Sequence, residues 1–121
     1  MGGMSISWQE NAERELSYGQ AALNANLEGR SRVCARRAAG YVIKEYFRLC
    51  NMVENSDNAY HLLVRFSEYP ELPDDIRMKA RHLCQRVNED YSMPDQVNLL
   101  TDAEILIQYL TERIDVLTMK R

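Results

Sequence analysis

Hydrophobic residues recur at intervals of three and four along most of the chain, which is the period of an amphipathic α-helix. The first such segment has one stripe of apolar or small residues: Trp8, Ala12, Leu16, Gly19, Leu23 and Leu27. Ser7 and Glu10 have the spacing of a capping box, in which the two side chains bond N–H groups of the first turn. We expect this helix to stop at Glu28-Gly29, because glycine adopts the left-handed C′ position without steric cost.

A second helix is predicted from about Arg30 to Met52. Its apolar arc is broad enough for a central helix with neighbours on two sides, and it comprises Cys34, Ala35, Ala38, Ala39, Tyr41, Val42, Tyr46, Leu49 and Val53. The tripeptide AAG at 38–40 removes side-chain bulk, so we expect another backbone to approach closely there. Any part of the arc left exposed in the monomer would be covered by a second copy or by a partner helix.

The rest of the chain predicts three more helical segments. The break ENSDN at 54–58 precedes a short helix that carries Leu62, Leu63 and Phe66, with Asp57 or Ser56 as its cap. The prolines of EYPELP end that helix, and Asp74 and Asp75 then favour a new N-terminus, because negative charge complements the positive end of a helix. The stripe of this fourth helix is Ile76, Ala80, Leu83, Cys84 and Val87, and the pattern fades at NEDYSMPDQ.

The final helix is predicted after a second capping box, Thr101 with Glu104. Its apolar positions are Ile105, Leu106, Tyr109, Leu110, Ile114 and Leu117. No segment has the alternation of a strand. The expected fold is therefore an all-α, up-and-down bundle with four main helices and one shorter element, in a single domain over 1–121.

Composition restricts the class of protein. The 121 residues carry a net charge of −3, so overall electrostatics gives no attraction to nucleic acid or acidic membranes. The spacing of Cys34, Cys50 and Cys84 fits no zinc or redox motif, and with two histidines we expect no metal and no cofactor. We predict reduced thiols in a cytoplasmic protein, without a signal peptide or membrane span.

Residues 30–48 are the strongest binding signal. They hold six cations against Glu45 alone, a local charge of +5 within an acidic chain. Arg32 with Arg36, and Lys44 with Arg48, are spaced at i, i+4 and so form ridges on the helix. Such ridges can hold the phosphates of a nucleotide or RNA, and the candidate binding residues are Arg32, Arg36, Arg37 and Lys44. Alternatively, these cations pair with acidic side chains across the bundle or face water. Tyr18, Tyr41, Tyr46 and Tyr60 could stack on bases, although tyrosines at helical spacing are typical of a core.

Several segments resemble the HEPN family of small helical-bundle domains. They are WQENAERELSYGQAAL (8–23), ARRAAGYVIKEYF (35–47), HLL (61–63), MPD (93–95) and TDAEILIQYLTERI (101–114). The resemblance implies one of two functions. Some HEPN proteins are metal-independent ribonucleases that use an Arg-x4–6-His motif at a dimer interface. Others bind nucleotides or partner proteins, commonly a small nucleotidyltransferase, and both types are usually homodimers.

Arg77 and His82 fit the Arg-x4-His spacing, but Met78 follows the arginine where catalytic members tend to have Asn, Asp or His. Positions five apart also diverge by roughly 140° around a helix, so the two side chains do not share a face. The sequence therefore favours a non-catalytic module that binds a nucleotide or a partner. One alternative is an endoribonuclease, with His82 as general acid/base and Arg77 on the phosphate. Another is a purely structural interaction protein.

Overall fold

Five α-helices account for most of the chain in a computed structural model that describes residues 7–52, 56–84 and 99–119. They are α1 (Trp8–Asn24), α2 (Glu28–Leu49), α3 (Ala59–Ser67), α4 (Asp74–Cys84) and α5 (Leu99–Met119). No strand occurs within those ranges. The predicted all-α class and helix number are confirmed, except that two helices are short rather than one.

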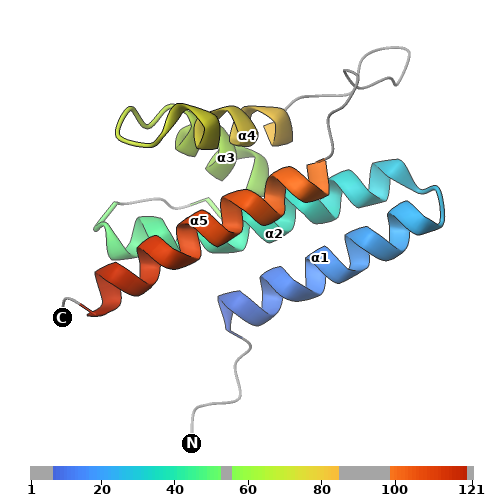
Figure 1. Cartoon of the computed structure of the whole chain (residues 1–121), viewed down its shortest axis with the longest axis horizontal. Helices are drawn as coiled ribbons and strands as arrows, with labels where there is room; N and C mark the ends of the chain where they lie inside the picture. Colours follow the sequence, from blue (N-terminus) through green and yellow to red (C-terminus); the bar gives the residue numbers. More distant parts are fainter. Residues whose placement is uncertain (1–6, 53–55, 85–98, 120–121) are drawn as a thin grey trace, which may run out of the picture.

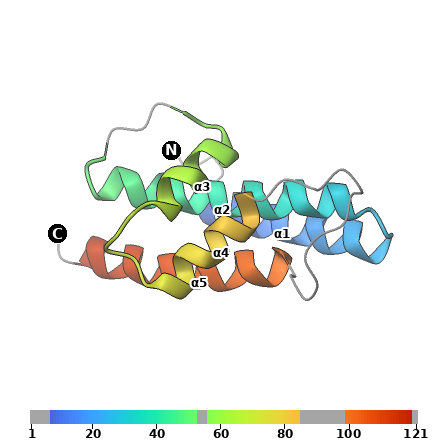
Figure 2. The ribbon, with the colours of Figure 1, turned by 90° about the horizontal axis from the view of Figure 1, so that it is seen from above.

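Helix α2 lies at the centre of the fold. It packs against α1, α5, α3 and, less extensively, α4. Figures 1 and 2 show α1, α2 and α5 running side by side, with the shorter α3 and α4 lying together on one side of this layer. The largest fully buried side chains come from α2, α3, α4 and α5: Val42, Ile43, Phe47, Leu62, Leu63, Phe66, Leu83, Leu106 and Leu110. The broad apolar arc of α2 allows this helix to contact all four of the other helices.

The start of α1 was predicted correctly, but its end was not. The capping box is present, with the Glu10 N–H 3.1 Å from Ser7 Oγ and the Ser7 N–H 3.4 Å from Glu10 Oε1. The residue in the left-handed region is Asn26, at φ 62°, rather than Gly29. The Leu27 N–H then donates to the Ala22 carbonyl at 2.8 Å, as in a Schellman motif. Gly29 belongs to the first turn of α2.

Asparagine also ends α2 and begins α3. Asn51, at φ 59°, follows the last turn of α2, which therefore ends at Leu49 rather than Met52. Asn58 caps α3, since its side chain accepts a hydrogen bond from the His61 N–H at 3.1 Å. The predicted caps Asp57 and Ser56 are thus wrong.

The predicted start of α4 is confirmed, with Asp74 and Asp75 in its first turn. The second predicted capping box is wrong, because Leu99 and Leu100 are already helical and Thr101 lies inside α5. The segments NEDYSMPDQ and MPD, together with Val53 and Val87, lie outside the described residues.

The aromatic core predicts how stability changes with alkaline pH. Burial, with a hydrogen bond to Cys50, raises the pKa of Tyr46 from 10.0 to about 12. Burial likewise raises the pKa of the Cys84 thiol from 9.0 to about 11. Both groups keep their proton in the folded chain at a pH where the unfolded chain has lost it, so their contribution to stability is present at neutral pH and lost as pH rises.

We therefore expect the free energy of unfolding to fall between about pH 9 and pH 12. In Tyr46→Phe the decline above pH 10 should be shallower, and in Cys84→Ala the decline should begin at higher pH. Urea titrations at fixed pH values measure this. An identical pH dependence in wild type and both variants would contradict it.

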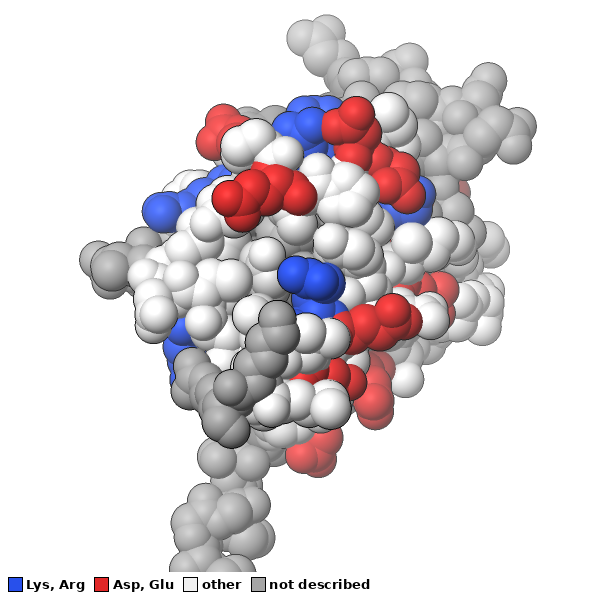
Figure 3. All heavy atoms as spheres, turned by 60° about the vertical axis from the view of Figure 1, so that its left-hand side comes forward, with Lys and Arg blue, Asp and Glu red and all other residues white. Residues whose placement is uncertain are grey.

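Charged groups of both signs lie on the face of the molecule that Figure 3 shows. Figure 3 shows acidic and basic side chains alternating around uncharged areas on one face, in keeping with the small net charge. Among the described helices, none combines the length and apolar character needed to cross a membrane.

Candidate functional site

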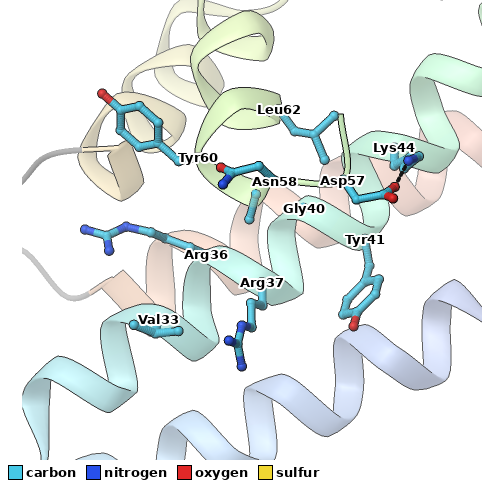
Figure 4. Close-up of a pocket in the computed structure, with 11 residues that line it drawn as sticks. Val33, Arg36, Arg37, Gly40, Tyr41, Lys44, Asp57, Asn58, Tyr60 and Leu62 are labelled. Carbon is cyan, nitrogen blue, oxygen red and sulfur yellow. Dashed lines mark ion pairs between the residues drawn. The ribbon is translucent and has the colours of Figure 1, made fainter. Parts of the chain in front are cut away.

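A cleft lies between α2 and the beginning of α3, with a volume of about 450 Å³ (Figure 4). From α2 it is lined by Val33, Arg36, Arg37, Gly40, Tyr41 and Lys44, and from the α3 side by Asp57, Asn58, Ala59, Tyr60 and Leu62. Three of the four predicted binding residues therefore line one cleft. Its volume is within the usual range for small-molecule sites.

Gly40 shapes the cleft by allowing α3 to approach α2. A Cβ atom at Gly40 would be 3.0 Å from the Ala59 Cβ and 3.2 Å from the Ala59 Cα. Both distances are tighter than ordinary Cβ contacts, so a side chain here would require Ala59 to move by a few tenths of an ångström. This confirms the close approach predicted from AAG. As a result the first residue of α3 is pressed against α2, and the cleft extends on either side of the contact (Figure 4).

Two of the three cations are already held by the fold. Arg36 Nε donates to the Leu83 carbonyl at 2.5 Å, so its positive charge lies at the C-terminal end of α4, where a helix favours cations. Lys44 forms an ion pair with Asp57 and lies 3.4 Å from the Ser56 carbonyl oxygen. The Lys44–Asp57 pair, dashed in Figure 4, closes one end of the cleft.

Arg37 is the cation of the cleft lining that is available to bind an anion. It is exposed, and within the described residues no carboxylate pairs with it. The lining carries three cations and one carboxylate, a net charge of +2 in a chain whose total is −3. The cleft is thus locally electropositive, and Arg37 can pair with an incoming anion without breaking an ion pair.

Arg32, the fourth predicted residue, does not line this cleft. It is half-buried, and its guanidinium lies near Gly29, with Nη2 3.7 Å from the position of a Cβ at that glycine. Arg48, which the sequence pairs with Lys44 in a ridge, instead forms a two-pronged pair with Glu45 at 2.6 and 2.9 Å. The cations of α2 therefore face in several directions, and only part of the +5 charge reaches the cleft.

Aromatic and backbone groups complete the lining. Tyr41 is 39% exposed, and Tyr60 is half-buried against the His61 ring, with ring centroids 6.1 Å apart. Ala59 and Tyr60 belong to the first turn of α3, whose N–H groups have no acceptor within their own helix. In Figure 4 Arg36 and Tyr60 extend toward the same end of the cleft, whereas Arg37 and Tyr41 extend toward α1.

The function of the cleft must be inferred from its own residues. The chain matches no family model, no curated protein and no solved structure. In the part of the chain that the structure describes, no three His, Cys, Asp or Glu side chains form a group able to hold a metal ion.

Arg77 and His82 lie on α4, outside the cleft, and have different partners. Arg77 pairs with Asp74 within the same helix, and its Nε is buried without an acceptor among the described residues. His82 Nδ1 lies 3.0 Å from Asp102 Oδ2, which connects α4 to α5. The described chain therefore gives both side chains structural contacts and does not bring them together.

The contribution of 57–62 was not apparent from the sequence. Asp57 was considered as a helix cap, Asn58 only as part of the break at 54–58, and Tyr60 only as an aromatic residue that could stack. Gly40 was the available signal, because a glycine in mid-helix indicates a close neighbour, but its spacing does not identify which segment approaches.

Proposed function

We propose that the chain is a cytoplasmic, non-catalytic HEPN-like module that binds a nucleotide in the cleft between α2 and α3. The observation that carries the proposal is that Arg36, Arg37 and Lys44 line one cleft whose lining also contains two tyrosines. Cations and aromatic rings are the groups that recognise the phosphates and base of a nucleotide.

The two parts of a nucleotide would occupy different parts of the lining. Phosphate oxygens accept hydrogen bonds either from the guanidinium of Arg37, on the side of the lining toward α1, or from N–H groups at the start of α3, where the helix dipole favours negative charge. The base then lies over Tyr41 or Tyr60. Arg36 contributes positive charge from a position fixed by the Leu83 carbonyl.

The resemblance to HEPN proteins supports the same proposal. In that family the non-catalytic members bind nucleotides or partners, and a small nucleotidyltransferase is the partner class that we propose. The separate pairing of Arg77 with Asp74 and of His82 with Asp102 favours this branch over the ribonuclease branch.

Titration with a fluorescent ATP analogue, the N-methylanthraniloyl ester, tests the proposal. Arg37→Gln should weaken binding by about tenfold or more, because a charge-assisted hydrogen bond contributes about 1.5–3 kcal/mol. Arg32→Gln is the matched control, since it removes the same charge from the same helix outside the cleft. Equal losses in the two variants would show that only the general charge of α2 matters, and absence of binding to wild type would refute the proposal.

The non-catalytic character has its own test. We expect wild type to leave a labelled, mixed-sequence RNA intact in EDTA. Cleavage that disappears in both Arg77→Ala and His82→Ala would contradict the proposal and identify a ribonuclease.

A further inference from the structure

The ion pair between Lys44 and Asp57 joins α2 to the segment that leads into α3, at one end of the cleft (Figure 4). Both residues line the cleft, so the pair places a carboxylate beside the surface that carries the cations. The positive charge of Lys44 is therefore offset within the lining itself. An incoming anion meets the Asp57 carboxylate at the same place where it would meet the Lys44 ammonium group.

The backbone around Asp57 is held in place, whereas its side chain is exposed. The Asn58 N–H donates to Ser56 Oγ at 3.0 Å, and Ala59 is pressed against α2. The side chain of Asp57 is 86% exposed and that of Lys44 is 42% exposed. An ion pair as exposed as this is weak, because water screens it and two flexible side chains must be ordered to form it. A phosphate group can therefore replace Asp57 as the partner of Lys44.

We propose that Asp57 competes with the phosphates of the nucleotide for Lys44, and so limits the negative charge that the cleft accepts. This inference rests on the proposed binding of a nucleotide in the cleft. A phosphate that approaches Lys44 must displace the carboxylate and is repelled by its like charge. The repulsion grows with the charge of the ligand, so it disfavours a nucleoside triphosphate more than a monophosphate. Asp57 is then a residue that determines specificity.

Glu45 provides a matched comparison on the same helix. It pairs with Arg48 through two contacts, of 2.6 and 2.9 Å. Glu45→Gln and Asp57→Asn therefore make the same kind of change, because each removes one negative charge and releases one cation of α2. Neither Glu45 nor Arg48 lines the cleft. A difference between the two variants thus reports the position of the carboxylate rather than the net charge of the chain.

Titrations with the N-methylanthraniloyl esters of AMP and ATP test the inference, in EDTA so that no Mg²⁺ neutralises the phosphates. Asp57→Asn should tighten ATP binding by about fivefold, the factor that corresponds to an exposed ion pair, and should tighten AMP binding less. Glu45→Gln should leave both affinities close to those of wild type. Adding Lys44→Gln to Asp57→Asn should remove the gain, because no ammonium group is then released.

Three results would each overturn the inference: no tighter ATP binding in Asp57→Asn, a gain for AMP as large as that for ATP, or an equal gain in Glu45→Gln. In each case, weaker binding by Arg37→Gln would still support a nucleotide in the cleft, so the two proposals fail separately. Absence of binding by wild type and Asp57→Asn alike would overturn both. Far-UV circular dichroism establishes that each variant is helical.

Discussion

Phe66→Ala is expected to lower the free energy of unfolding by about 3–5 kcal/mol, the usual range when a large aromatic residue is removed from a core. Phe66 on α3 is fully buried. Its ring centroid lies 6.3 Å from that of Tyr46, in an edge-to-face arrangement, and 6.4 Å from that of Phe47. The variant thus loses buried apolar area, leaves a cavity and removes two aromatic contacts.

The consequence extends beyond stability, because Phe66 holds α3 against α2 and α3 forms one wall of the cleft. Urea unfolding gives the stability change, with Met78→Ala as the control. Met78 is 52% exposed on α4, so its truncation should change the free energy of unfolding by no more than about 0.5 kcal/mol. A loss below about 1 kcal/mol for Phe66→Ala would contradict the packing of α3 described above.

Gly40→Leu is expected to have the second largest effect, a loss of up to about 3 kcal/mol, because overpacking forces the backbones apart. The nearest atoms to a Cβ at Gly40 are the Cβ and Cα of Ala59, and neither can rotate away as a long side chain could. The gain in helix propensity, about 1 kcal/mol relative to glycine, does not offset this cost. Since α3 must move, nucleotide binding in the cleft should also be lost.

Gly29→Leu is the matched control. It is exposed, and the nearest side-chain atom to a Cβ there is Arg32 Nη2 at 3.7 Å, an ordinary contact with the end of a flexible side chain. Helix propensity then dominates, and stability should rise by up to about 1 kcal/mol. Urea unfolding of both variants at one protein concentration measures the difference. Equal effects at the two glycines would show that α3 does not press against Gly40.

The helices could be predicted where their features depend on residues that are close together in the sequence. The apolar stripes and the Ser7–Glu10 box depend on residues within one or two turns, so the sequence contains the necessary information. The errors at the C-terminal ends of α1 and α2 both involve asparagine. Asn26 adopts the left-handed conformation that the pattern assigned to Gly29, and Asn51 adopts it at the end of α2. Gly29 matches a stop signal as well as Asn26 does, and only the hydrogen bond from Leu27 to Ala22 distinguishes them.

The candidate site likewise has features that could be predicted from local sequence and features that depend on how distant helices pack. The cations of α2 were found because their i, i+4 spacing on one helix is a local property. Which of them face a cleft depends on where α3 and α4 pack, and this separates Arg36 and Arg37 from Arg32. Likewise, helix geometry alone predicted that the side chains of Arg77 and His82 do not share a face. The partner of His82 could not be predicted in this way, because Asp102 lies twenty residues further along the chain.

Chemical-shift mapping by ¹H–¹⁵N NMR during titration with ATP tests the central claim most directly, because it locates the ligand without altering the protein. The account predicts shifts that saturate together at the amides of Arg37, Gly40, Ala59 and Tyr60, with little change along the exposed side of α5. Shifts centred on Arg77 and His82, or no shifts at all, would contradict it.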